Sequence, residues 1–125
     1  MEAEPEPVDL ACALHWVGGD RALLQELVGI FVEEAPGRLA DLKRATVARD
    51  AKTVERVAHS LKGSAGILGA ASLRAASAEL EERVLAQRVD GEMDLVARVE
   101  GELERVLAFF RDPAWRGRLD LDEAP

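Results

Sequence analysis

Apolar residues recur at intervals of three and four along most of the chain, which is the spacing of one face of an α-helix. The pattern runs through residues 20–42, 50–68, about 71–88 and 92–110, and a shorter apolar run occupies residues 10–17. Four long amphipathic segments joined by short turns bury their apolar faces best against one another. The pattern therefore predicts an all-α fold, an antiparallel up-down four-helix bundle with a short N-terminal capping helix.

The expected helix ends carry residues that suit them. Asp20 and Asp50 precede apolar periodic segments, where a carboxylate can accept the free backbone N–H groups of a first turn. Gly69 follows the segment 50–68, where a helix often ends in a left-handed residue. Pro36-Gly37 interrupts an apolar face that continues on both sides, so we expect either one long kinked helix or two helices that abut there. Asp90-Gly91 is typical of a turn.

The two ends of the sequence differ from the periodic middle. Residues 1–7 are acidic and proline-containing, so we expect a disordered lead-in or the tail of a linker. Residues 8–112 then form the bundle, and residues 113–125 form a loosely held tail apart from Trp115. Trp16, at the end of the short apolar run, is expected to cover one end of the core.

Composition narrows the class of protein. The chain has 125 residues, 48% of them hydrophobic and 4% aromatic, which suits one helical domain and is too short for a kinase with its own nucleotide site. A net charge of −8 argues against nucleic acid as a partner. One cysteine allows no internal disulfide and suits a reducing compartment. No apolar run approaches the ~20 residues of a membrane span, and the start is acidic, unlike a signal peptide. We therefore expect a cytoplasmic monomer without membrane contact.

His59 is the residue that the helical pattern does not explain. On a helical wheel the apolar residues of 50–68 gather within about 60° of one direction, roughly opposite His59. The histidine therefore points to solvent. Two glycines lie on the same side of the helix, and each lowers helix stability by roughly 1 kcal/mol relative to alanine. The residues that share its face are Glu55, Arg56, Lys62, Gly63 and Gly66. The absence of side chains at the glycines leaves room for a bulky partner to approach His59.

A nucleophilic imidazole must be neutral, and a hydrogen bond from one ring nitrogen leaves the other free to react. Glu81 is a candidate acceptor. If the chain turns at Gly69-Ala70, His59 lies about ten residues before the turn and Glu81 about eleven after it, which puts both at nearly the same height in an antiparallel pair. Lys62, three residues after His59, shares its face and can screen the charge of a phosphoryl group.

The residues around His59 resemble the histidine-containing phosphotransfer (HPt) domain of bacterial multistep phosphorelays. The resemblance rests on His59-Ser60-Leu61-Lys62-Gly63-Ser64-Ala65, then Leu68-Gly69-Ala70, Leu73 and Leu80-Glu81. Outside this motif it extends to Gly19-Asp20, Leu23-Leu24, Phe31, Pro36, Leu39 and Leu42, and so covers nearly the whole chain.

The resemblance implies a phosphocarrier without kinase activity of its own. His59 would accept a phosphoryl group at Nε2 from the aspartate of one receiver domain and pass it to another. Lys62 would lie beside the phosphoryl group, Gly63 would allow close approach, and Glu81 would bind the imidazole. The receiver would supply magnesium, so the chain needs no cofactor and no metal of its own.

The receiver would contact the residues that surround His59. We expect contacts from Gly63, Gly66, Glu55, Arg56 and Ile67. Exposed apolar residues beside the histidine would add to this surface. The candidates for that apolar patch are Leu14, Val17, Ala22 and Ile67.

The same residues also allow other interpretations. A lone surface histidine is usually without a function, Lys62 can be a solvated lysine, and Glu81 can belong to a solvated acidic face. His15 and Cys12 are too few and too distant from His59 to indicate a metal site. A helical docking module for a receiver or kinase, which carries no phosphate, would share these features. So would the phosphoacceptor domain of a chemotaxis-type kinase, either as an independent chain or as one module of a larger protein.

Overall fold

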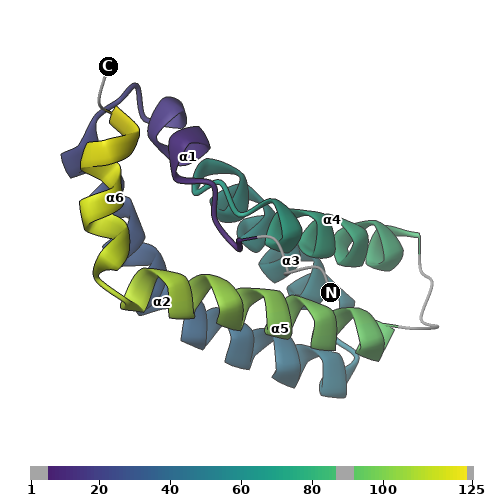
Figure 1. The fold of residues 1–125 in the computed structure, drawn as a ribbon. Helices are drawn as coiled ribbons and strands as arrows, with labels where there is room; N and C mark the ends of the chain where they lie inside the picture. Colours follow the sequence, from purple (N-terminus) through teal and green to yellow (C-terminus); the bar gives the residue numbers. More distant parts are fainter. Residues whose placement is uncertain (1–5, 87–91, 124–125) are drawn as a thin grey trace, which may run out of the picture.

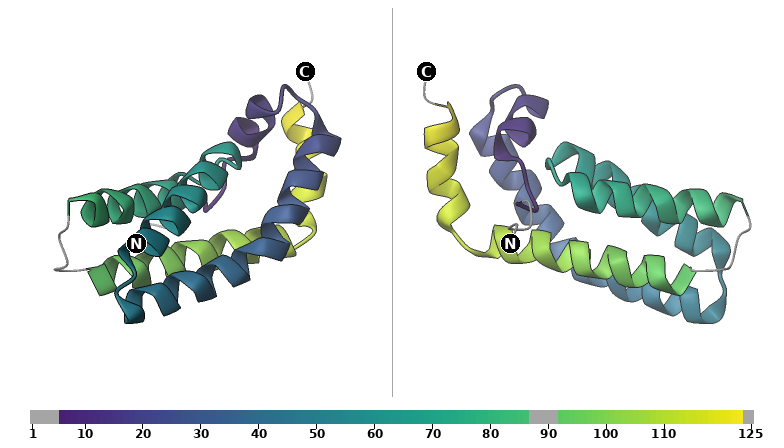
Figure 2. Two further views of the ribbon diagram at one scale, coloured as in Figure 1. Left: turned by 180° about the vertical axis from the view of Figure 1, so that it is seen from behind. Right: turned by 45° about the vertical axis from the view of Figure 1, so that its right-hand side comes forward.

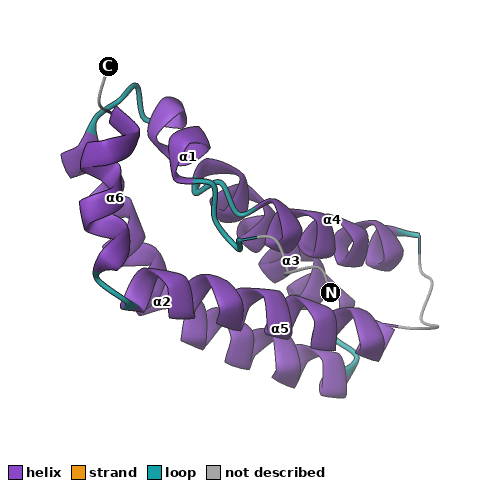
Figure 3. Ribbon diagram, viewed as in Figure 1, coloured by secondary structure: helices purple, strands orange, loops and turns teal. Residues whose placement is uncertain are grey.

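The computed structural model describes residues 6–86 and 92–123, and within them every regular element is a helix (Figures 1 and 3). The all-α prediction is confirmed. No helix in these ranges is long and apolar enough to span a bilayer. The helices are α1 (Leu10–Trp16), α2 (Arg21–Ala48), α3 (Ala51–Ile67), α4 (Ala71–Leu85), α5 (Glu92–Arg111) and α6 (Ala114–Glu123).

The four long helices α2 to α5 pack around one core. α3 packs against α2 and α4, and α5 packs against α4 and α2, so that each long helix has two long neighbours. The α3–α4 pair has the most extensive contact. α1 and α6 pack against each other at one end of the molecule (Figures 1 and 2). The largest fully buried side chains are Trp115, Leu10, Leu24, Leu42, Leu61, Leu73, Leu80, Leu103 and Leu119.

Both expected aspartate caps are present. The Asp20 carboxylate accepts the backbone N–H of Leu23 at 3.0 Å, at the start of α2. The Asp50 carboxylate accepts the backbone N–H of Thr53 at 3.2 Å and its hydroxyl at 2.7 Å, at the start of α3. The Thr53 hydrogen bonds are the largest cause of a lowered pKa of Asp50. These caps fix where α2 and α3 begin.

The turn between α3 and α4 depends on Gly69. This residue has φ +71°, the left-handed conformation expected after a helix end. The Asp9 backbone N–H donates to the Gly69 carbonyl at 2.8 Å, and a Cβ on Gly69 would collide with the Asp9 carbonyl oxygen. The backbone at Asp9, just before α1, is therefore held against this turn.

Of the two possibilities at Pro36, the structure has one continuous helix. Pro36 lies inside α2, which spans 28 residues and bends about halfway along (Figure 2). Proline removes one backbone donor and clashes with the preceding turn, which bends a helix. Phe31, Ala35 and Leu42 are nevertheless buried in the same core. Burial on both sides of the bend holds the helix together.

The C-terminal part differs from the expected loose tail. Residues 114–123 form α6, Trp115 is 2% exposed, and its indole N–H donates to the Phe110 carbonyl at 2.9 Å. Trp16, expected over the core, is instead 65% exposed. α6 folds back onto α1, so Trp115 takes the buried position that was expected for Trp16.

At the other end of the bundle, α4 ends at Leu85, three residues before the expected end. The expected turn at Asp90-Gly91 lies outside the described residues.

Candidate functional site

His59 projects from the solvent side of α3. Its side chain is 69% exposed, whereas Val54, Val57 and Leu61 of the same helix are buried. This is the orientation that the helical pattern predicts, because the apolar face of α3 turns toward α2 and α4. A reacting group from outside can therefore reach the imidazole.

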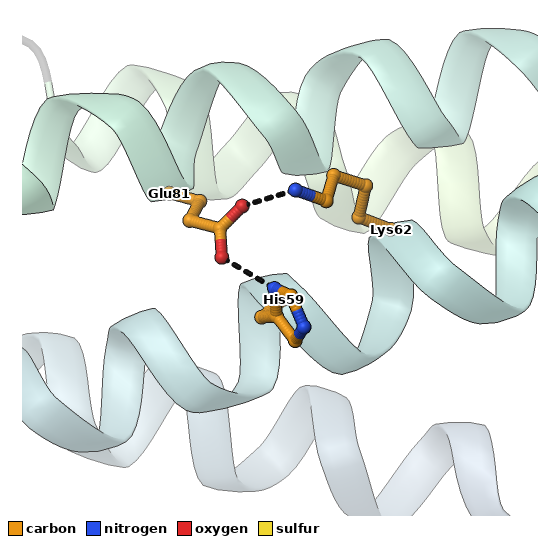
Figure 4. A network of polar contacts seen from close by, with 3 residues as sticks. All are labelled: His59, Lys62 and Glu81. Carbon is orange, nitrogen blue, oxygen red and sulfur yellow. Dashed lines mark hydrogen bonds and ion pairs between the residues drawn. The ribbon is translucent and has the colours of Figure 1, made fainter.

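Glu81 reaches His59 from α4. Its carboxylate Oε2 lies 2.6 Å from His59 Nδ1 (Figure 4), and its side chain is only 10% exposed. α3 and α4 pack extensively against each other. Each contributes a small buried residue, Ala58 on α3 and Ser77 on α4. The contact expected from the equal heights of His59 and Glu81 is present.

This contact determines which ring nitrogen can react. An ionised carboxylate only accepts hydrogen bonds, so Nδ1 carries the hydrogen and donates it to Glu81. In the neutral ring Nε2 then holds the lone pair, and it points away from the carboxylate in Figure 4. In that form the ring has an exposed nitrogen with a free lone pair.

Lys62 binds the same carboxylate. Its Nζ donates to Glu81 Oε1 at 2.5 Å, and its side chain is 32% exposed. The hydrogen bond from Lys62 is the largest cause of a lowered pKa of Glu81, followed by the contact with His59, and these outweigh the opposing effect of desolvation. Glu81 is therefore ionised at neutral pH. The sequence analysis placed Lys62 on the same face as His59 but did not predict this ion pair. A helical wheel shows directions around one helix, and it does not show how far a side chain extends to a neighbouring helix.

The expected partner residues lie around this centre. Gly63 is exposed, and a Cβ added there would meet no atom within 4 Å. A Cβ at Gly66 would lie 3.5 Å from the Arg74 side chain, so α4 covers part of that position. Arg56 is exposed and Glu55 half-buried. Of the two glycines, Gly63 is therefore the one with open space beside it.

The expected apolar patch needs correction. Leu14 is 6% exposed and belongs to the core, and Val17 is partly buried against it. Ala22 is exposed, and Ile67 is 44% exposed. α1 turns its apolar side to the bundle, so Leu14 cannot reach a partner.

An apolar residue that the sequence analysis missed is Ile30 of α2, which is 48% exposed. It and Ile67 line a groove of about 110 Å³ between α2 and α3, together with Leu27, Phe31 and Leu68. The sequence feature that could have revealed Ile30 is its position three residues after Leu27, which places it at the margin of the apolar face of α2.

The described residues contain no group of three or more histidine, cysteine, aspartate or glutamate side chains that could hold a metal ion.

A family model described as the Hpt domain matches residues 26–109. The match covers more than half of the chain, and the chain belongs to the Hpt family. Hpt domains are phosphocarriers that interact with receiver domains, and the chain accordingly has a histidine phosphotransfer role in phosphorelays.

Among solved structures, the chain is similar to histidine-containing phosphotransfer protein B (HptB) from Pseudomonas aeruginosa PAO1. The two share 26% sequence identity with a TM-score of 0.79, over 92% of this chain and 98% of that one. No curated protein sequence matches significantly.

Proposed function

We propose that His59 is the phosphoacceptor and that it shuttles a phosphoryl group from the aspartate of one receiver domain to the aspartate of another. The observation that carries this proposal is the contact of His59 Nδ1 with the buried Glu81 carboxylate, which leaves Nε2 as the reactive nitrogen of an exposed ring. The carrier would be the antiparallel up-down bundle of α2 to α5.

In the forward step, the Nε2 lone pair forms a bond to phosphorus while the bond from phosphorus to the aspartyl oxygen breaks. The aspartate leaves as a carboxylate. The imidazole keeps its Nδ1 hydrogen and becomes positively charged, and the Glu81 carboxylate at 2.6 Å stabilises that charge. The reverse sequence passes the phosphoryl group to a second receiver, with Nε2 as the leaving group.

Lys62 supplies positive charge beside the transferred group. An ammonium has three hydrogens, and the Glu81 contact uses one of them. The remaining two can donate to phosphoryl oxygens, whose negative charge is spread over the group during transfer. The receiver would bring the magnesium ion.

The receiver would dock over Gly63, where the space beside His59 is open. Gly66, Arg56 and Glu55 would surround this contact. Ile67 and the groove that it shares with Ile30 would provide apolar area. Burying exposed apolar side chains would favour association.

The test is phosphoryl transfer from a labelled receiver to the purified chain. The wild type and the matched His15→Gln variant, which changes the exposed histidine on α1, should acquire a phosphate that is lost in acid and stable in base. His59→Gln should remain unlabelled with its helical content intact. Labelling of a folded His59→Gln variant would contradict the proposal. Receiver binding without any labelling of the wild type would indicate a docking module instead.

A further inference from the structure

Three cations of α3 and α4 have no acidic partner, although the chain has 24 acidic residues and a net charge of −8. They are Lys52 and Arg56 on α3 and Arg74 on α4. All three side chains are exposed, and within residues 6–86 and 92–123 no hydrogen bond or ion pair joins them to a carboxylate. Lys62, by contrast, binds Glu81. The charges of the three unpaired cations are therefore available to a partner.

The three cations lie on the side of the bundle that carries His59. Lys52 and Arg56 precede His59 by about two turns and one turn of α3, and on a helical wheel both point within about 60° of its direction. Arg74 reaches the same face from α4, because its Cδ and Nε lie 3.5 Å from the place that a Cβ on Gly66 would take. Gly66 follows His59 by about two turns. His59 thus stands within a row of cations roughly 20 Å long.

Acidic groups on this face are fewer and less exposed. Glu81 is 10% exposed and already holds an ammonium, and Glu55 is half-buried. Asp50 uses its carboxylate for Thr53, whose two hydrogen bonds are the largest causes of its lowered pKa, and the two cations of α3 add to the same shift. Glu82 is exposed but is turned about 100° from Glu81 around α4. The surface around His59 is therefore more positive than the protein as a whole.

The proposed partner has the opposite charge at its reactive face. Magnesium takes oxygen ligands, so a receiver that holds the ion beside its aspartate presents carboxylates there. A phosphoryl group on that aspartate adds negative charge. An acidic protein repels such a face from most sides, whereas a local row of cations attracts it. We propose that Lys52, Arg56 and Arg74 form a steering surface that draws the acidic face of a receiver toward His59 and orients it before contact.

The inference deepens the proposed function and rests on it for the receiver as partner. Charges at the edge of a contact act mainly on the association rate and on its dependence on salt. The screening length is about 30 Å at 0.01 M ionic strength and about 3 Å at 1 M. The whole row of cations therefore acts together at low salt and is almost silent at high salt.

The test is the association rate of the full chain with the isolated receiver domain of the labelling assay, measured by stopped-flow fluorescence of a dye on the receiver. The receiver is unphosphorylated and free of magnesium, so that its carboxylates keep their charge and no transfer takes place. The variants are Arg56→Gln, Arg74→Gln and a triple variant that also carries Lys52→Gln. The matched control is Arg111→Gln, which removes an exposed cation of α5, a helix that packs against α2 and α4.

At 0.01 M ionic strength the triple variant should associate about tenfold more slowly than the wild type. Arg56→Gln and Arg74→Gln should each slow association by roughly twofold, because each removes one charge of the row. Arg111→Gln should leave the rate nearly unchanged. At 1 M ionic strength the wild type and the triple variant should associate at similar rates, since the charges are screened.

Three results would overturn the inference. One is a folded triple variant that associates as fast as the wild type at low salt. Another is equal slowing by Arg74→Gln and Arg111→Gln, which would mean that only net charge matters. The third is a difference between the triple variant and the wild type that is unchanged at 1 M, which would mean direct contact in place of steering. None of these measurements involves phosphoryl transfer, so the role of His59 is judged separately by its labelling.

Discussion

Gly63→Ala separates the stability of α3 from its use as a docking surface. Gly63 lies in the interior of a helix, and an added Cβ would meet no atom within 4 Å. Alanine should therefore stabilise the fold by about 1 kcal/mol through its higher helix propensity. For a chain of 125 residues this raises Tm by roughly 4 °C.

The same methyl group should hinder transfer, because it occupies the space over which the receiver is proposed to approach His59. Overpacking a close contact costs about 1–3 kcal/mol, so we expect transfer to slow by roughly tenfold at receiver concentrations below saturation. Gly101→Ala is the matched control, since Gly101 is an exposed glycine within α5 that also has no atom within 4 Å of an added Cβ. It should raise Tm without slowing transfer.

Thermal unfolding and transfer of label from a phosphorylated receiver are measured on both variants. A loss of stability in Gly63→Ala would refute the assignment of open space at this position. Equal transfer rates for Gly63→Ala and Gly101→Ala would refute the close approach of the receiver there.

Three further predictions concern the fold and the charge of the site. Gly69→Ala should destabilise the chain by more than about 2 kcal/mol in urea unfolding, because φ is +71° and the methyl would strike the Asp9 carbonyl; an unchanged midpoint would contradict this. Trp115→Ala should cost about 3–5 kcal/mol, while Trp16→Ala, at an exposed position, should change stability little. The pKa of Glu81 is lowered in the fold, so its stabilising contribution is present above the ordinary value of 4.5 and is lost as pH falls through the lowered value. The stability difference between wild type and Glu81→Gln should accordingly shrink in that acidic range, and a difference independent of pH would oppose it.

The parts of the fold that the sequence predicted are those determined locally. Asp20 and Asp50 cap helices because a carboxylate next to free N–H groups needs no tertiary partner. A distortion at Pro36 could also be predicted locally. Whether the helix continues through it could not, since this depends on the burial of Phe31 and Leu42 on either side. α6 was not predicted, because its ten residues are largely polar and show too few apolar positions for a helical period, and its buried Trp115 and Leu119 find their partners only in the tertiary fold.

The candidate site shows the same division. The contact of His59 with Glu81 followed from the α3–α4 turn, because a turn at Gly69 sets the heights of both residues. The Lys62–Glu81 ion pair depends on how far a flexible side chain reaches across to the neighbouring helix, and no spacing rule contains that. Leu14 was misplaced because the direction in which α1 faces is decided by its packing on the bundle.

The most direct measurement of the central claim is the identity of the phosphorylated atom. The chain is labelled by a phosphorylated receiver, kept at alkaline pH, and analysed by ³¹P and ¹⁵N NMR with His15→Gln to assign the signals. We expect a single phosphorus–nitrogen bond at Nε2 of His59, with Nδ1 still carrying hydrogen. Phosphate on Nδ1 of His59, or on any other residue, would contradict it.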